Sequence, residues 1–408
     1  MSATPATSFD LTKVPTASAD ELIAWAEDIC LDFEFATVRA WKERNPGKKA
    51  VGFLPTYVPR ELIHACGMLP VGVLGADDSL EIVRGDACFQ SYICHLPRSV
   101  VELGLTGRLD MLSGMLFPAV CDVIRNLSGI WKMQFPDKLS LYFDAPQNFD
   151  MEVGGVFYRR VLEEILEELV KLSGHEPSND ELNASIAVYN ENRRLCAELY
   201  DLRAAQPWVA QASEVYILMR AGMLLPVEQH NSVLVAYMEA VRKEGEDGTR
   251  RELDNARVVV SGSFCEQPPL ALVRTLERSG CYVVEDDYMM VTRWLGSEVP
   301  TDGDALHSLV KSYMDYEGES AAKFVPDGCK KGTQLINRIQ DTGGEGVLFS
   351  APSFCDPALL DQPMLQEALD AEGISYTSFK YSENTGQLQP IRERAGTFAD
   401  TIKLWGQA

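Results

Sequence analysis

Two short stretches that lie far apart in the sequence end in the same pair of residues. "LFPAVCDVI" (116–124) and "FSAPSFCDPAL" (349–359) each contain an apolar run, a break at a small residue or proline, and then Cys-Asp. Thiolates are soft ligands that suit zinc or an iron–sulfur cluster. Cys121 and Cys355 are therefore the first candidates for a metal site.

The other cysteines need not share that role. The chain has ten cysteines, and the default interpretation of any one is a small buried hydrophobe. We assign that role to Cys30, Cys66 and Cys196, which lie in helical-looking runs, and to Cys281, which opens an apolar strand. The start "MSATPATSFDLTKVP" has no basic or apolar region of an export signal. We therefore expect a cytoplasmic protein whose cysteines are reduced thiols or metal ligands.

The elements that must position these thiols form an α/β pattern. Short apolar runs alternate with helix-like segments such as "VPRELIHACG" (58–67), and this alternation predicts a parallel sheet. The runs of the first half are "AVGFLP" (50–55), "LPVGVLG" (69–75), "DMLSGMLFP" (110–118) and "LSLYFDAP" (139–146).

The middle of the chain shows helical periodicity and few strand signals, and the α/β pattern then returns. The strand-like runs of the second half are "ARVVVSGSF" (256–264), "CYVVEDD" (281–287), "EGVLFSAPSF" (345–354) and "ISYTSFKY" (374–381). With 408 residues, the chain is longer than a single hydrophobic core usually supports. We expect an N-terminal helical segment (1–47), a first α/β lobe (48–150), a helical segment (151–254) and a second α/β lobe (255–408).

The two α/β halves form a weak internal repeat. Strand, proline-led helix, glycine and strand occur in residues 51–75 and again in 258–287, and each half later has a strand that ends in Cys-Asp. We expect two Rossmann-like lobes that face each other across a cleft, with Cys121 and Cys355 in equivalent positions. Open parallel sheets bind ligands beyond the carboxyl ends of their strands, which is where both thiols fall.

A third thiol, Cys88, follows the second strand by a loop. Three thiols from two lobes would suit a cluster held in the cleft. The chain has no CxxC pair, which a structural zinc site usually shows, so scattered single cysteines fit an iron–sulfur cluster better. The spacing alone leaves a cluster and a chance arrangement equally open, because Cys265 also lies at a strand end.

Several functions are disfavoured by composition and motifs. The net charge of −23 argues against a nucleic-acid or anionic-membrane partner, and no apolar stretch approaches the about 20 residues of a membrane span. No phosphate-binding GxxxxGK[ST] loop is present, so the chain is not a P-loop ATPase. "GGEG" (343–346) precedes its strand instead of following it, which argues against a nicotinamide enzyme.

Acid–base groups are weaker candidates. Glu285, Asp286 and Asp287 end a strand and point towards the crevice, either for catalysis or to cap the following turn. His95 stands beside Cys94 and is a further candidate. The acidic residues that follow Cys121 and Cys355 are expected to be helix N-caps, and a helix N-terminus there would help to hold a cluster's negative charge.

Longer stretches carry a resemblance to a known family. The sequence resembles the benzoyl-CoA reductase/2-hydroxyacyl-CoA dehydratase family, and within it the smaller cluster-binding subunits of ATP-dependent reductases. The resemblance covers most of the chain. It is carried by "FLPTYVPRELIHACGMLPVGVLG" (53–75), "EIVRGDACFQSYICHLPRSVVELGLTGRLDMLSGMLFPAVCDVIRNLSGIW" (81–131), "VVEDDYMMVTRW" (283–294) and "APSFCD" (351–356).

The resemblance implies a cofactor. Family members bind a [4Fe-4S] cluster through three cysteines, two in the first lobe and one in the second, and Cys88, Cys121 and Cys355 match those positions. Such clusters normally take four cysteines. We prefer three ligands with the fourth iron open; the alternative is a fourth ligand from Cys94 or Cys265.

The resemblance also implies a reaction and partners. The expected function is low-potential single-electron reduction of an aryl-CoA ring to a cyclic dienoyl-CoA. It would act with a homologous cluster-binding subunit and ATP-hydrolysing activator subunits, with ferredoxin as the upstream donor. The alternatives are a subunit of a radical 2-hydroxyacyl-CoA dehydratase and a non-catalytic metal-binding scaffold. Candidates for binding the CoA phosphates are Arg84, Arg98, Arg125 and Arg293.

Overall fold

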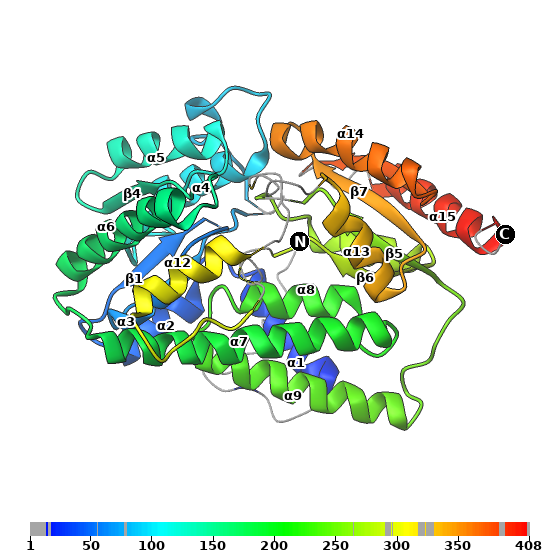
Figure 1. Cartoon of the computed structure of the whole chain (residues 1–408), viewed down its shortest axis with the longest axis horizontal. Helices are drawn as coiled ribbons and strands as arrows, with labels where there is room; N and C mark the ends of the chain where they lie inside the picture. Colours follow the sequence, from blue (N-terminus) through cyan, green and yellow to red (C-terminus); the bar gives the residue numbers. More distant parts are fainter. Residues whose placement is uncertain are drawn as a thin grey trace, which may run out of the picture.

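The computed structural model describes residues 14, 18–54, 56–76, 80–263, 265–289, 295, 297–316, 323, 330–382 and 388–405. In this part of the chain two four-stranded parallel sheets form the two lobes (Figure 1). The first sheet has the strand order β2-β1-β3-β4. Its strands are β1 (Ala50–Phe53), β2 (Leu69–Gly72), β3 (Leu112–Pro118) and β4 (Leu139–Phe143).

The second sheet repeats that topology with the order β6-β5-β7-β8. Its strands are β5 (Ala256–Ser261), β6 (Cys281–Asp286), β7 (Gly346–Pro352) and β8 (Tyr376–Tyr381). The match between the two orders confirms the predicted two-lobed α/β fold. It also places β3 and β7, the strands that precede the two Cys-Asp pairs, at the same place in their sheets.

Helices flank both sheets, as parallel strands require. The first lobe carries α3 (Arg60–Ala65), the short 3₁₀ helix η1 (Asp86–Cys88), α4 (His95–Leu105) and α5 (Asp122–Gln134). The second lobe carries α10 (Leu270–Arg278), α13 (Thr333–Thr342), α14 (Asp356–Ala371) and α15 (Leu388–Trp405).

A helical layer joins the two lobes. Its longest helix is α7, which packs against α3 of the first lobe and β6 of the second (Figure 1). With 27 residues it is roughly 40 Å long. A capping box between Ser178 and Glu181 fixes its start. The layer and its neighbours comprise α1 (Ala19–Cys30), α2 (Ala36–Arg44), the π-helical turn η2 (Met151–Gly155), α6 (Val156–Ser173), α7 (Asn179–Ala205), α8 (Ala212–Ala221), α9 (Val227–Glu246) and α12 (Ala305–Asp315).

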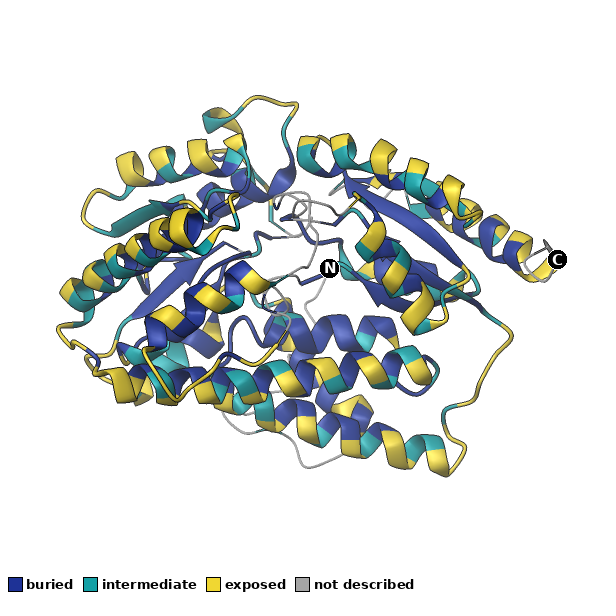
Figure 2. Cartoon of the chain, in the orientation of Figure 1, coloured by how far each residue is buried: buried dark blue, intermediate teal, exposed yellow. Residues whose placement is uncertain are grey.

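Six of the eight described strands are deeply buried, including the edge strands β2 and β6. Nearly every residue of β1, β3, β5 and β7 is buried, whereas the edge strands β4 and β8 are partly exposed (Figure 2). One continuous apolar core includes residues of both sheets and of the helical layer. A helix long and apolar enough to cross a bilayer does not occur in the described part of the chain.

Candidate functional site

The two Cys-Asp stretches meet between the lobes. Cys121 is the N-cap of α5 and Cys355 is the N-cap of α14, so each thiol stands where a central strand passes into a helix. Burial is the main effect that raises the pKa of Cys355, to about 12, and the nearby Cys121 raises it further. The two thiols therefore lie within electrostatic reach of each other, although they come from different lobes.

Two more thiols join this pair. Cys94 is the N-cap of α4, and Cys265 follows β5. Burial raises the pKa of both, and each is raised further by Cys121 and Cys355. In the described residues these four cysteines form one group, which we call the thiol cluster: Cys94, Cys121, Cys265 and Cys355.

Cys88 has a different setting. It ends the short helix η1 and is half-buried. In the described residues, Cys88 is not one of the groups that shift the pKa of a cysteine in the thiol cluster. The same residues also contain no set of three His, Cys, Asp or Glu already arranged around a metal position. The assignment of Cys88, Cys121 and Cys355 as ligands stays a prediction.

The four thiols of the thiol cluster nevertheless suit an anionic group that contains a soft metal. Three of the four thiols cap helices, so the positive ends of α4, α5 and α14 point to the same region. Burial raises the pKa of Cys121, and the backbone N–H groups of Ile124 and Val123 oppose that shift. Helix N-termini of this kind favour bound anions. The helix N-termini would therefore stabilise the negative charge of cluster-bound thiolates, whereas protonated thiols carry no charge to stabilise.

The acidic residues after these cysteines do not have the expected role. Both helices begin one residue earlier than predicted, so Asp122 and Asp356 are the first helical residues and the cysteines are the N-caps. The expectation followed the general N-cap preference for aspartate over cysteine. It was wrong because the cysteine one residue earlier takes the N-cap position in both helices. At the first turn the two carboxylates still interact favourably with the helix dipole.

A buried glutamate ties the two lobes together beside the thiols. Glu266 of the second lobe is only 8% exposed. Its Oε2 accepts the N–H of Leu96 at 3.0 Å, and the N–H of His95 also donates to it. Burial raises the pKa of Glu266 to about 7. Because these donors belong to the first turn of α4, Glu266 caps the helix that positions Cys94.

Glu102 organises the segment that leads to Cys88. This buried carboxylate on α4 accepts the backbone N–H groups of Val83, Arg84 and Gly85 on one oxygen, at 3.0, 2.6 and 2.8 Å. A Cβ on Gly85 would stand 2.1 Å from a carbonyl oxygen of α4, so only glycine permits this close approach. The role of Glu102 was not predictable from the sequence because its partners are 17 to 19 residues away in a loop.

We expect Glu102→Ala to release this loop. Three N–H groups would lose their acceptor, at a cost of about 1 to 3 kcal/mol for each one that stays buried. Tryptic cleavage after Arg84 should therefore become about tenfold faster or more. Glu191→Ala, which removes an exposed carboxylate from α7, is the matched control. Unchanged cleavage in Glu102→Ala would show that the loop does not depend on this carboxylate.

The acidic residues that end β6 are engaged in internal contacts. Asp286 pairs with Arg203 at 2.5 Å and accepts the hydroxyl of Tyr200 at 3.1 Å. It also accepts the N–H of Tyr288 at 2.9 Å, so it caps the following turn as one of its predicted roles requires. Glu285 accepts the N–H of Asp286. These contacts favour a structural role for both over a catalytic one.

Asp287 holds the loop that leads to Cys265. Its carboxylate accepts the N–H of Gly262 at 2.6 Å, the N–H of Ser263 at 3.1 Å and the hydroxyl of Ser261 at 3.2 Å. Burial raises the pKa of Asp287 from 3.8 to about 6, against the opposing effects of Arg338 and these N–H groups.

The raised pKa of Asp287 predicts a pH dependence of stability. Between pH 3.8 and about 6 the folded chain holds a proton that the unfolded chain has lost. The contribution of Asp287 to stability is therefore largest at low pH and declines as the pH rises through this range. In thermal unfolding the melting temperature of Asp287→Asn should rise relative to wild type over that interval. A constant difference across the interval would contradict the assignment.

The remaining predicted residues have varied settings. His95 is buried at the start of α4, next to Cys94. Arg84 donates to the carbonyl of Leu105 at 2.8 Å and Arg98 pairs with Asp86 at 2.9 Å, so both brace the Cys88 segment. Arg125 is exposed on α5, and Arg293 lies outside the described residues.

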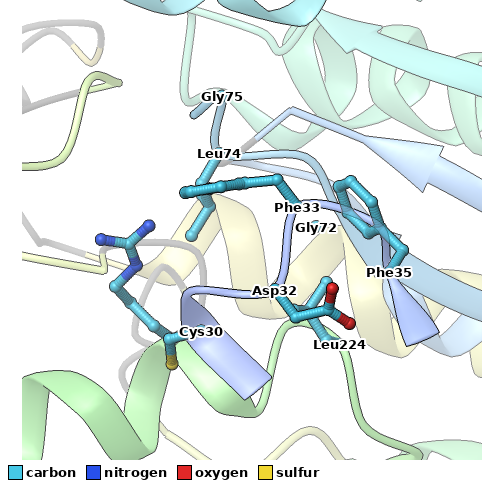
Figure 3. Close-up of a pocket in the computed structure, with 9 residues that line it drawn as sticks. Cys30, Asp32, Phe33, Phe35, Gly72, Leu74, Gly75 and Leu224 are labelled. Carbon is cyan, nitrogen blue, oxygen red and sulfur yellow. The ribbon is translucent and has the colours of Figure 1, made fainter. Parts of the chain in front are cut away.

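The cysteines predicted to be core residues are buried. Cys66, Cys196 and Cys281 are at most 3% exposed. Cys30 lies beside a cavity of about 20 Å³, which has room for about one water molecule (Figure 3). Its thiol donates to the carbonyl of Ile217 at 3.2 Å. Burial raises the pKa of Cys30 to about 12, so it is a packing residue.

Fold and site together define a class: a two-lobed α/β protein in which thiols of both lobes gather at helix N-termini. Comparison with known proteins agrees. Residues 55–402 match the model of the family "2-hydroxyglutaryl-CoA dehydratase, D-component". The chain belongs to this family.

Individual relatives share nearly the full length. The chain is 51% identical to a subunit of benzoyl-CoA reductase from Thauera aromatica, over 95% of this chain and 100% of the relative. It is 28% identical to the beta subunit of (R)-2-hydroxyglutaryl-CoA dehydratase of Acidaminococcus fermentans, over 88% of this chain and 94% of the relative. It is also 28% identical to the beta subunit of lactoyl-CoA dehydratase of Anaerotignum propionicum, over 87% of this chain and 92% of the relative. These comparisons confirm the resemblance that the sequence indicated.

Proposed function

We propose that this chain is the iron–sulfur subunit of an ATP-dependent aryl-CoA reductase of the benzoyl-CoA type. The observation that carries the proposal is the 51% identity to a benzoyl-CoA reductase subunit over nearly the whole chain, against 28% to the dehydratase subunits. The thiol cluster between the lobes supports it, because such a subunit needs a buried soft-ligand site.

The cofactor would be a [4Fe-4S] cluster. Cys88, Cys121 and Cys355 would hold it, with Cys94 or Cys265 as the alternative source of a fourth ligand. The proximity of Cys94 and Cys265 to Cys121 and Cys355 supports keeping that alternative. When bound, the cluster supplies single electrons at low potential, tuned by burial and by hydrogen bonds to sulfur.

The residues of this chain would prepare the site for that chemistry. The N-termini of α4, α5 and α14 would stabilise the negative charge of the ligand thiolates. Glu266 would keep α4 of the first lobe docked on the second lobe. Cys94, Cys265 and Cys355 are buried and Cys121 is half-buried. Shielding from water would matter there, because exposed radical anions would be protonated or quenched.

The proposed reaction needs partners. Two electrons and two protons would convert the aromatic ring of the CoA thioester into a cyclic diene. The chain has no P-loop, so ATP hydrolysis would belong to activator subunits that receive electrons from ferredoxin. A homologous cluster-binding subunit would be the other member of the complex. A fully active monomer in sedimentation and assay would contradict this arrangement.

The second candidate is a subunit of a radical 2-hydroxyacyl-CoA dehydratase. It is favoured by the family model and by the dehydratase relatives. The two functions differ in their use of ATP. A reductase consumes ATP in proportion to ring reduction, whereas a dehydratase needs it only for activation and releases water from a 2-hydroxyacyl-CoA. A metal-binding scaffold would turn over neither substrate.

The test is an anaerobic assay of the complex formed by this chain and its partners. Benzoyl-CoA and a 2-hydroxyacyl-CoA are supplied separately, and ATP hydrolysis is measured beside product formation. Consumption of benzoyl-CoA with proportional ATP hydrolysis supports the reductase. Dehydration of the 2-hydroxyacyl-CoA with ATP needed only at the start would replace it with the second candidate.

A further inference from the structure

A second cavity lies at the opposite end of the second sheet from the thiol cluster. Its volume is about 450 Å³, within the range of about 300 to 1,000 Å³ that small-molecule sites occupy. Asn255, just before β5, and Cys281, the first residue of β6, line it. Cys265 lies beyond the other end of β5. A strand of six residues spans roughly 20 Å, so this cavity is separate from the thiol cluster.

Four arginines line the cavity, in a chain whose net charge is −23. Two of them are neutralised by carboxylates. Arg274 makes a two-pronged ion pair with Glu27 at 2.9 and 2.6 Å. Arg250 pairs with Glu214 and Glu244 at 2.6 and 2.7 Å.

The other two arginines, Arg251 and Arg278, are exposed. In the described part of the chain neither has a carboxylate within ion-pair distance. Arg278 ends α10, where a cation also suits the helix dipole. Arg251 lies in the loop before β5, so it has no such role at a helix C-terminus. Two guanidinium groups are thus left to attract an anion, and their planar shape suits phosphate.

The one carboxylate that lines the cavity is already engaged. Glu277 accepts the N–H of Ser213 at 3.2 Å, and the N–H of Ala212 also donates to it. These donors belong to the first turn of α8, so Glu277 acts as a cap for that helix. Its charge is compensated there and does not cancel the two free guanidinium groups.

An aromatic surface lines the same cavity. The ring of Trp208 is half-buried and stands 6.2 Å from the ring of Tyr282 at an angle of 52°. Tyr282 is held in place, because its hydroxyl accepts the N–H of Leu253 at 2.6 Å. The half-buried indole of Trp208, packed beside this fixed ring, can stack on a planar ring of a ligand.

We propose that this cavity is a binding site for the diphosphate nucleotide group found in ADP and in coenzyme A. The phosphates lie against Arg251 and Arg278, and the base lies against Trp208. The proposal rests on the charges and the cavity, and it does not depend on the reaction proposed above. Because the site is remote from the thiols, its occupant is not the reacting end of a substrate.

The test is calorimetric titration of the full chain, purified without ATP-hydrolysing subunits, with ADP, coenzyme A and pyrophosphate in turn. We expect ADP or coenzyme A to bind more tightly than pyrophosphate, because only they reach Trp208. Tighter binding of ADP points to the free nucleotide as the natural ligand, and tighter binding of coenzyme A points to the coenzyme. Pyrophosphate that binds as tightly as both would overturn the stacking role of Trp208.

Variants test the two guanidinium groups. Arg251→Gln combined with Arg278→Gln should weaken nucleotide binding about 100-fold, because each charge-assisted hydrogen bond is worth about a factor of ten. The matched control is Arg194→Gln with Arg242→Gln, which removes the same charge from side chains that pair with Glu198 on the surface. Equal weakening in the control, unchanged affinity in the cavity variant, or no binding of any probe by wild type at millimolar concentration would overturn the site.

Discussion

Replacing Cys355 with alanine is expected to deplete bound iron, abolish turnover and loosen the second lobe. Cys355 is 6% exposed and caps α14, within electrostatic reach of Cys121 in the other lobe. A cluster held by both residues would cross-link the lobes. Because metal-binding energy is also folding energy, loss of one ligand should destabilise more than the site itself. The readouts are iron per chain, activity and protease sensitivity, all measured anaerobically.

Cys281→Ala is the matched control for Cys355→Ala. Cys281 is fully buried at the start of β6, at the far end of the sheet from the thiol cluster. Its loss should leave iron content and activity nearly unchanged and cost about 1 kcal/mol of packing. If Cys355→Ala keeps full iron and activity while Cys281→Ala loses them, the assignment of the site is wrong.

Removing the carboxylate of Asp286 is expected to cost about 3 to 5 kcal/mol of stability. Arg203 is 1% exposed, and its buried guanidinium would lose its ion-pair partner and keep only the weaker effect of Glu285. Asp286→Ala should therefore lower the midpoint of urea unfolding strongly. The pair joins α7 of the helical layer to β6, so the second lobe should also detach more readily from that layer.

Two further variants separate charge burial from loss of contact. Asp286→Leu combined with Arg203→Met removes both charges, and it should recover most of the stability lost in Asp286→Ala. Glu168→Ala breaks an exposed pair with Lys171 and should cost far less stability than Asp286→Ala. A loss in Asp286→Ala no larger than that of Glu168→Ala would contradict the importance of the buried pair.

The fold was predictable from the sequence because local patterns determine most of it. Apolar runs between turn residues marked β1 to β8, and the repeat correctly placed Cys121 and Cys355 after equivalent strands. The helical middle of the chain was also evident from its periodicity. These features depend on hydrophobic spacing, which a single sequence displays directly.

The contacts around the site were not predictable because they join distant parts of the chain. Glu266 caps a helix whose backbone donor is 170 residues away, and Arg203 meets Asp286 across 83 residues. Nothing local distinguishes these residues from surface charges. Likewise, the grouping of Cys94 with Cys265 follows from how the two lobes pack, and the sequence offered them only as alternatives.

We infer that this chain serves an aryl-CoA reductase through a cluster bound between its lobes. The most direct measurement is ATP-dependent consumption of benzoyl-CoA by the anaerobically purified complex, compared between wild type and Cys355→Ala. We predict that wild type forms the cyclic dienoyl-CoA with proportional ATP hydrolysis, and that Cys355→Ala forms none. Wild type that leaves benzoyl-CoA unchanged but dehydrates a 2-hydroxyacyl-CoA would contradict the account.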